Sequence, residues 1–224
     1  MATVTQPETP NAAFVEDNTT PRPVPLCPEI TLRLADEALP LWTRTEEALG
    51  RMGLPPPFWA FAWAGGQALA RYVLDNPPVV RGRAVLDLGA GSGLVAIAAM
   101  AAGAQRVLAA DPDRWAIAAI GLNARLNGVE VSVTCEDVLE GSDRIAARFG
   151  TILVGDLFYE REVADRLFPR LAAWRAAGAT VLIGDPGRSY LPKDRLVRIA
   201  EYGVPQSREL EDMEIKRTAV WRLA

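Results

Sequence analysis

The sequence predicts an α/β protein whose seven-stranded, mostly parallel sheet carries helices on both faces and ends in an antiparallel strand pair. From residue 84 onward, short apolar runs alternate with helix-like segments in units of about 25 residues, which is the pattern of a parallel sheet. A glycine-rich turn joins the apolar run at 84–88 directly to a helix. After the fifth run the alternation stops, and two strand-like segments follow each other across a polar loop.

The elements can be assigned in chain order. A short strand is expected at 30–34, before the segment 36–52, and a helix at 65–75. The parallel strands are expected at 84–88, 106–110, 129–134, 151–155 and 179–184, and the helices near 93–102, 112–127 and 160–176. The segments 195–203 and 214–223 should pair antiparallel and close the sheet at seven strands. A plain dinucleotide-binding Rossmann domain does not end in this way.

Length and composition indicate one domain that follows a disordered or loosely packed N-terminal segment. The 224 residues are 50% hydrophobic and 23% charged, which is enough for one core of about 190 residues plus a tail. Residues 1–28 are rich in Pro and Thr, so we expect a disordered or loosely packed tail before a single domain at 29–224. The acidic residues of this tail and its lack of an apolar run do not fit an import or secretion signal. We therefore expect a bacterial, cytoplasmic protein.

Composition also excludes several classes of function. The net charge of −4 opposes a nucleic-acid backbone as the main partner, and no stretch approaches the roughly 18 apolar residues of a membrane span. The chain contains no histidine, which excludes Ser-His-Asp hydrolysis, histidine-ligated metals and a histidine base. Cys27 and Cys135 are too few for a disulfide framework or a zinc site. We expect a monomer that binds no metal, nucleic acid or membrane.

The most informative stretch is Asp-Leu-Gly-Ala-Gly-Ser-Gly at 87–93. The glycines at 89, 91 and 93 remove the side chains that would keep a ligand from the backbone. The free N–H groups of the following helix would face that ligand. The spacing differs from the G-x-G-x-x-G of dinucleotide folds, and Asp87 would repel a pyrophosphate while suiting a cationic ligand. S-adenosylmethionine fits this description, and its product would be S-adenosylhomocysteine. The alternative is a strand–helix turn without a ligand.

Acidic residues follow the next two strands. Asp111 ends the second strand, where a carboxylate can bind both ribose hydroxyls; the alternative is an N-cap for the next helix. Glu136 and Asp137 follow the third strand, where a carboxylate could accept the adenine amino group, and Asp137 is the choice of the two. The alternative is a solvated turn pair.

The fourth strand ends in Gly-Asp-Leu-Phe-Tyr at 155–159 and should face the transferred methyl group. Asp156 could attract an ammonium, and the phenol oxygen of Tyr159 could bind an amine. We predict these two as the catalytic residues, and a basic amine as the acceptor. The alternative is a capping Asp among buried aromatics.

Several motifs together give the chain a specific resemblance. Asp-Leu-Phe-Tyr at 156–159 resembles the D-x-x-Y signature of the seven-strand, Rossmann-like, S-adenosylmethionine-dependent protein-lysine methyltransferases. Phe-Trp-Ala-Phe-Ala-Trp-Ala-Gly-Gly-Gln at 58–67, the loop at 87–93, and Ile-Gly-Asp-Pro-Gly-Arg at 183–188 resemble the electron transfer flavoprotein β-subunit lysine methyltransferases. The resemblance extends from about residue 28 to the C-terminus.

The resemblance implies a protein substrate, the electron transfer flavoprotein β-subunit, methylated on lysines beside its dehydrogenase-docking loop, with a ribosomal protein as a further target. It also implies that Trp63 walls the cofactor pocket and that Gly66 and Gln67 adjoin it. The chemistry of Trp63 agrees, because aromatic faces attract sulfonium-like cations. For Trp59 and Phe61 the alternative that they are ordinary core residues stays open.

Three functions therefore compete: a protein-lysine methyltransferase, a small-molecule N-methyltransferase acting on a nicotinamide-like amine, and a non-catalytic S-adenosylmethionine-binding module. The Asp156/Tyr159 pair favours the first. A non-catalytic module should have lost the glycines or the acids at 87 and 111, and neither loss is present.

Overall fold

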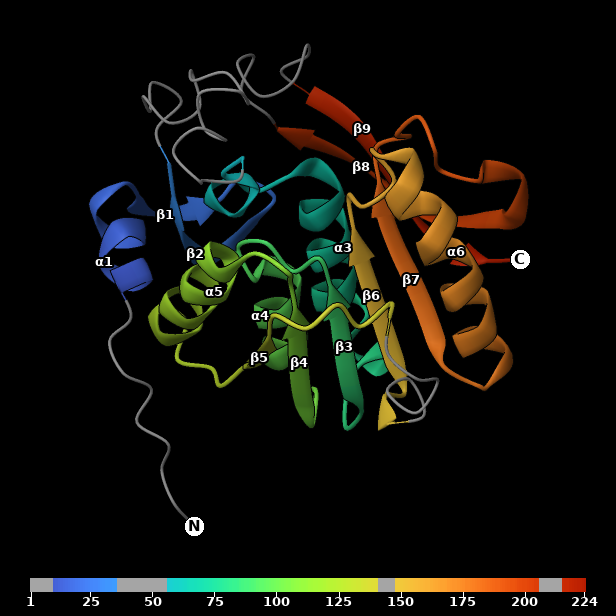
Figure 1. Cartoon of the computed structure of the whole chain (residues 1–224). Helices are drawn as coiled ribbons and strands as arrows, with labels where there is room; N and C mark the ends of the chain where they lie inside the picture. Colours follow the sequence, from blue (N-terminus) through green and yellow to red (C-terminus); the bar gives the residue numbers. More distant parts are fainter. Residues whose placement is uncertain (1–9, 36–55, 141–147, 206–214) are drawn as a thin grey trace.

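The computed structural model describes residues 10–35, 56–140, 148–205 and 215–224, so the predicted segment 36–52 lies outside the described residues. Its main sheet has the strand order β5-β4-β3-β6-β7-β9-β8 (Figure 1). The parallel strands are β3 (Ala84–Leu88), β4 (Arg106–Ala110), β5 (Ser132–Thr134), β6 (Thr151–Gly155) and β7 (Thr180–Asp185). The antiparallel strands are β8 (Leu196–Pro205) and β9 (Ile215–Leu223). The predicted seven-stranded sheet and its closing strand pair are confirmed.

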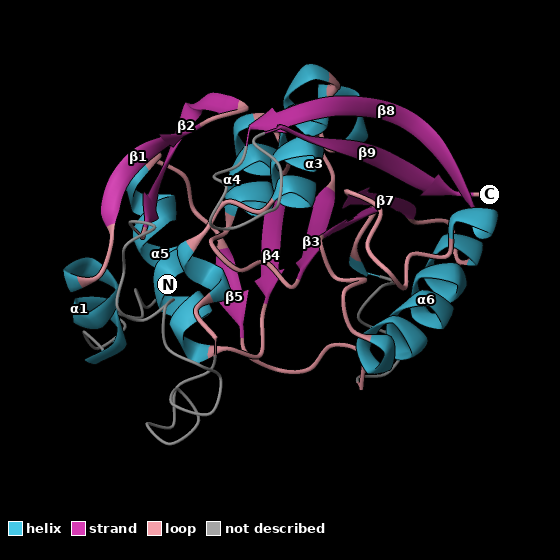
Figure 2. Ribbon diagram, turned by 90° about the horizontal axis from the view of Figure 1, so that it is seen from above, coloured by secondary structure: helices cyan, strands magenta, loops and turns pink. Residues whose placement is uncertain are grey.

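Helices cover both faces of the sheet. Successive strand residues point to opposite sides, and apolar residues on both sides pack against helices. Val85 packs with α3 (Ala64–Asp75) and α4 (Leu94–Ala101), whereas its neighbour Leu86 packs with α6 (Arg161–Ala176) on the other face. Figure 2 shows these two layers from above. α5 (Arg114–Leu126) lies with α3 and α4 through Ile120. No helix in the described part of the chain is long and apolar enough to cross a membrane.

The N-terminal region corrects a prediction. In place of the expected loose tail at 1–28, the described residues form helix α1 (Pro10–Asp17) and an antiparallel hairpin of β1 (Thr20–Val24) and β2 (Cys27–Leu34). Val15, Val24 and Cys27 are fully buried. These residues pack on the rest of the molecule, so the loose-tail prediction is wrong for them.

The hairpin is held by a side chain of α5 and by the residue that caps its C-terminus. Asn127 accepts a hydrogen bond from the Thr31 amide at 3.0 Å and donates one to its carbonyl at 2.6 Å, and Asn123 accepts one from the Arg33 amide at 2.7 Å. Two asparagines thus satisfy backbone groups of β2 that would otherwise lack partners. Composition could not reveal this, because the partners lie 90 or more residues away along the chain.

The N-terminal helix also supports the segment before α3. Phe14 of α1 packs against Trp59 of the short helix η1 (Phe58–Ala60) and against Trp115 of α5, with ring centroids 6.5 and 4.5 Å apart. The Ala35 amide donates to the Ala60 carbonyl at 2.9 Å. The start of the chain therefore braces the segment that leads into Trp63.

Candidate active site

A cavity of about 480 Å³ lies at the carboxyl ends of the parallel strands, the edge where open α/β sheets bind ligands. Residues after β3, β4 and β5 line one side, and residues after β6 and β7 line the other. A smaller hollow of about 40 Å³ adjoins it beneath the glycine loop. We refer to the side formed after β3, β4 and β5 as the cofactor side and to the side formed after β6 and β7 as the acceptor side.

The glycine loop on the cofactor side adopts backbone conformations that favour glycine. Gly89, Gly91 and Gly93 have φ values of 61°, 51° and 82°. A Cβ on Gly89 would clash with the Leu157 side chain, whereas at Gly91 the nearest atom would be 4.0 Å away. Gly91 lines both hollows, so its backbone is open to a ligand.

Asp87 lies beneath this loop and accepts a hydrogen bond from the Ala96 amide of α4 at 3.0 Å. Burial raises the pKa of its carboxyl to about 8. The sequence predicts a fixed negative charge at Asp87, whereas burial in the structure favours the neutral acid.

Asp111 is directed into the loop. Its Oδ2 accepts from the Gly91 amide at 2.8 Å, its Oδ1 accepts from the Asp113 amide at 3.0 Å, and burial raises the pKa of this carboxyl. The N-cap of α5 is Asp113, which accepts from the Trp115 amide at 2.9 Å. The capping alternative for Asp111 is therefore wrong.

Glu136 and Asp137 both line the cavity. Asp137 accepts a hydrogen bond from Arg166 of α6 at 2.6 Å and another from the Leu139 amide at 2.9 Å. Burial works in the opposite direction, but the Arg166 hydrogen bond holds the pKa of Asp137 below its usual range. Asp137 is thus a charged side chain fixed at the far end of the cofactor side.

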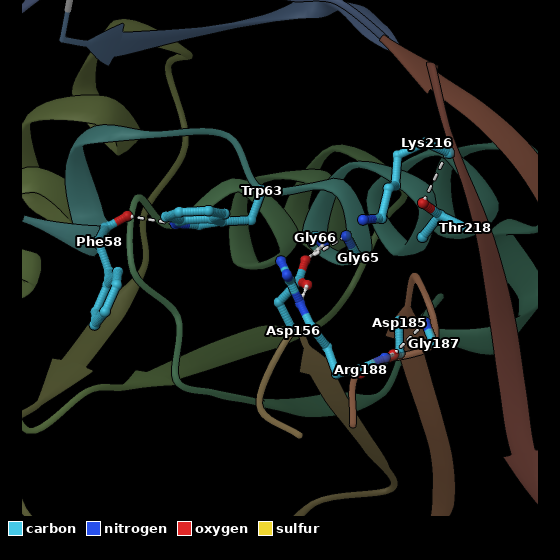
Figure 3. Close-up of polar contacts among 10 residues, drawn as sticks. All are labelled: Phe58, Trp63, Gly65, Gly66, Asp156, Asp185, Gly187, Arg188, Lys216 and Thr218. Carbon is cyan, nitrogen blue, oxygen red and sulfur yellow. Dashed lines mark hydrogen bonds and ion pairs between the residues drawn. The ribbon is translucent and has the colours of Figure 1, made fainter. Parts of the chain in front are cut away.

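Asp156 begins the acceptor side, directly after β6, with φ at 55°. Its Oδ1 accepts from Arg188 Nε at 2.9 Å, and its Oδ2 accepts from the amides of Gly65 and Gly66 in the first turn of α3 (Figure 3). It is 8% exposed, and burial raises its pKa against the opposing charge of Arg188. Both carboxylate oxygens have partners and the residue is almost fully buried, so Asp156 contacts α3 and Arg188 and offers little surface to an incoming ammonium.

Aromatic rings form the wall between the two sides. Trp63 donates from Nε1 to the Phe58 carbonyl at 2.8 Å, and the Phe58 ring lies 5.9 Å from Trp63 and 5.7 Å from Tyr159. Tyr159 is 40% exposed, and partial burial raises its pKa to about 12, so the phenol keeps its proton. All three rings line the cavity.

Known proteins of similar sequence decide the family. The electron transfer flavoprotein beta subunit lysine methyltransferase of Rattus norvegicus is 40% identical over 216 residues, covering 93% of this chain and 82% of that protein. The protein of that name from Danio rerio is 41% identical over 202 residues, covering 88% and 76%. The chain belongs to the electron transfer flavoprotein beta subunit lysine methyltransferase family.

Two further similarities concern smaller parts or the fold alone. The family described as Ribosomal protein L11 methyltransferase (PrmA) matches residues 67–155. A crystal structure of a methyltransferase complexed with SAH has a TM-score of 0.54 at 11% identity, covering 87% of this chain and 53% of that one. The chain is therefore a protein-lysine methyltransferase that uses S-adenosylmethionine, with the fold of that enzyme class.

The residues present fit that cofactor. The open backbone at Gly91, the Asp111 carboxylate beside it and the aromatic face of Trp63 border one connected space. Its volume of about 480 Å³ lies within the range of pockets for ligands of this size. Among the described residues, no three His, Cys, Asp or Glu side chains gather in a way that could hold a metal ion.

The methyltransferase departs from the sequence prediction at Gln67. Gly66 lines the small hollow as expected, but Gln67 is 1% exposed and lines neither hollow. Its amide donates to the Ala62 carbonyl at 2.6 Å and accepts from the Leu26 amide at 3.2 Å. Gln67 therefore ties α3 to the hairpin, and its predicted place beside the cofactor is wrong.

Some residues that shape the acceptor side were not predicted from the sequence. Arg188, part of the family motif at 183–188, is the ion-pair partner of Asp156. Gly65 and Gly184 let α3 approach β7 closely, because a Cβ on Gly184 would lie 2.7 Å from Leu69 Cβ. The glycine pairs at 65–66 and 184–187 were a visible signal of a close helix–strand contact.

Proposed function

We propose that this methyltransferase transfers methyl groups to lysine side chains of the electron transfer flavoprotein β-subunit. The similarity to relatives named for that substrate carries the proposal, because it extends over 93% of the chain and includes both sides of the cavity. The Ribosomal protein L11 methyltransferase match supports a ribosomal target less well. It ends at residue 155, before Asp156 and Tyr159, and so covers only the cofactor side.

On the cofactor side, the residues already described would hold S-adenosylmethionine. The backbone at Gly89, Gly91 and Gly93 would admit its amino-acid portion, and Asp111 would accept hydrogen bonds from the ribose hydroxyls. Asp137 would accept from the adenine amino group, and Trp63 would offer its face to the positive charge. When bound, the cofactor supplies an electrophilic methyl group, which passes to the lysine nitrogen as the bond from carbon to sulfur breaks.

On the acceptor side, the chain must bind a neutral amine. A free lysine has a pKa of about 10.4, so only about 1 in 2,500 side chains is neutral at pH 7. Phe58, Trp63 and Tyr159 line an apolar slot in which removal from water disfavours the charged ammonium. The protonated phenol of Tyr159 can donate to or accept from the amine and so orient its lone pair. The proton leaves to water before the substrate seals the slot, and orientation supplies most of the rate.

Mass spectrometry of the purified β-subunit tests the proposal. Incubation with enzyme and S-adenosylmethionine should add mass in steps of about 14 Da on lysines. The enzyme has only two lysines of its own, Lys193 and Lys216, so a Lys193→Arg/Lys216→Arg variant removes any signal from self-methylation. Methylation of a small amine such as nicotinamide, with none on the subunit, would favour the small-molecule alternative. Methylation of ribosomal protein L11 alone would favour the ribosomal one, and no transfer to any acceptor would favour the binding module.

A further inference from the structure

Arg188 is fixed on the acceptor side at both its backbone and its side chain. Asp185 Oδ1 accepts hydrogen bonds from the amides of Gly187 at 2.6 Å and Arg188 at 2.7 Å, and Gly187 has φ at 95°. The guanidinium lies 5.9 Å from the centroid of the Trp63 ring, and Nε bonds to Asp156 (Figure 3). Arg188 also lines the cavity. Its charge is therefore held in one place beside the slot.

This arrangement changes what Asp156 can do. Asp156 is 8% exposed and its carboxylate already accepts hydrogen bonds from Arg188 and from two amides of α3, so a substrate ammonium would compete with Arg188 for its charge. Breaking a largely buried ion pair leaves an uncompensated charge and is strongly destabilising. The pair of Asp156 and Arg188 therefore stays intact when the lysine enters.

We propose that Arg188 is a positioning residue for methyl transfer, which neutralises Asp156 and so prevents that carboxylate from stabilising the protonated, unreactive form of the substrate lysine. The proposal rests on the function proposed above. A lone carboxylate within 4–6 Å raises the pKa of an amine by about 1–3 units. Such a rise would reduce the neutral fraction of the lysine by about 10- to 1,000-fold. A carboxylate that is already paired exerts much less of this effect.

Other titratable or charged groups lie around the pair on the surrounding elements. They are Asp185 at the end of β7, Tyr159 and Glu160 after β6, Asp111 and Asp113 after β4, Asp137 with Arg166 of α6, and Lys216 of β9, whose side chain points toward the first turn of α3 in Figure 3. Burial raises the pKa of Asp185 to about 6 and that of Tyr159 to about 12. These two groups titrate on either side of the range in which the bound lysine should lose its proton.

The test is the pH dependence of kcat, which reports ionisations in the enzyme–substrate complex. It is measured with saturating β-subunit and S-adenosylmethionine for the wild type, Arg188→Gln, Asp156→Asn and the double variant. Arg188→Gln should move the rising limb upward by at least about one pH unit, because Asp156 then has no cationic partner. Asp156→Asn should move it downward, and the double variant, which leaves neither charge, should return it close to the wild-type position. Arg188→Lys, which keeps the charge, should restore most of the wild-type profile.

Calorimetry with S-adenosylhomocysteine is the control, and all four variants should bind it within a few-fold of the wild type. An unmoved limb in Arg188→Gln, or a shift that persists in the double variant, would overturn the proposal. If Arg188→Gln does not fold, Asp156→Asn decides, because an upward shift there contradicts the proposal.

If the wild-type enzyme leaves the β-subunit unmethylated, the proposed substrate is refuted, but the proposed role of Arg188 is not. A measurement without substrate covers that case. The ¹³C carboxyl signal of Asp156 should titrate at higher pH in Arg188→Gln than in the wild type. An identical titration would show that Arg188 does not hold the charge of Asp156.

Discussion

The two sides of the cavity hold their acidic residues by different means. On the cofactor side, Asp87 and Asp111 accept hydrogen bonds from backbone amides no more than 20 residues away along the chain. On the acceptor side, Asp156 is held by Gly65, 91 residues away, and by the side chain of Arg188, 32 residues away. The glycine loop on the cofactor side is thus built from local geometry, although Asp137 at the far end of that side depends on Arg166, 29 residues away. The acceptor side exists only once α3 and β7 have come together. Substitutions should therefore separate cofactor binding from methyl transfer.

The largest separation should come from Gly91→Arg. Its side chain would project into the cavity, so affinity for S-adenosylhomocysteine should fall by more than about 100-fold, equivalent to about 2.7 kcal/mol. Gly91→Ala is the matched control, because it meets open space and suffers only the left-handed backbone cost of about 1–2 kcal/mol. Isothermal titration calorimetry measures both. Unchanged affinity in Gly91→Arg would mean that this loop does not hold the cofactor.

Asp156→Ala should act on the acceptor side. It leaves Arg188 and the α3 amides without their acceptor, so the free energy of unfolding should fall by about 3–5 kcal/mol and methyl transfer should be lost. Affinity for S-adenosylhomocysteine should stay within a few-fold of the wild type. Urea unfolding and a labelled-methyl assay check this, with Asp156→Asn as the milder control. Near-normal turnover in Asp156→Ala would contradict the assignment of the acceptor side.

The pH dependence of stability should report on Asp87. Its pKa is about 8 in the folded protein and near 3.8 when unfolded, so the folded state binds the extra proton between these values. Stability from this group is complete below about pH 4 and is lost as the pH rises through about 8, at roughly 1.4 kcal/mol per unit. Asp113 and Asp185, with pKa values of about 6, add to the slope at lower pH. Asp87→Asn should therefore remove most of the slope in urea unfolding between pH 6 and 8; an unchanged slope would show that Asp87 is charged in the fold.

The smallest effect should come from the aromatic wall. Trp63→Leu should weaken S-adenosylmethionine binding by about 0.5–2 kcal/mol, or roughly 2- to 30-fold, through loss of the aromatic face. Phe58→Leu is the matched control, because Phe58 contacts Tyr159 and should change the KM for the protein substrate and not cofactor affinity. Calorimetry and initial rates distinguish the two. Equal effects of both variants on cofactor affinity would show that the two sides of the cavity do not act separately.

The same contrast explains how much could be predicted from sequence. The strands β3, β4 and β6, the glycine loop and the position of Asp111 follow from short-range patterns, and the structure has them where expected. β5 is shorter than expected, beginning at Ser132 and not at 129. Such patterns can be recognised in a sequence because they repeat within a few residues.

The misses all depend on contacts between distant parts of the chain. The hairpin at the start is stabilised by Asn123 and Asn127, and Gln67 is turned away from the cavity to bond Leu26. Arg188 reaches Asp156 from the loop after β7. The neutral state of Asp87 depends on burial, which a linear sequence does not display. None of these has a local sequence signature.

The position of β9 has a consequence for synthesis. β9 lies between β7 and β8 in the sheet, although it follows both along the chain. A nascent polypeptide emerges from its N-terminus, so β8 leaves the ribosome before β9, the strand with which it pairs. The five parallel strands can assemble in the meantime, with one edge of β7 still bare. During that interval the enzyme can have a formed cofactor loop and an open sheet edge beside Asp185, and an unpaired edge of this kind can pair with another chain.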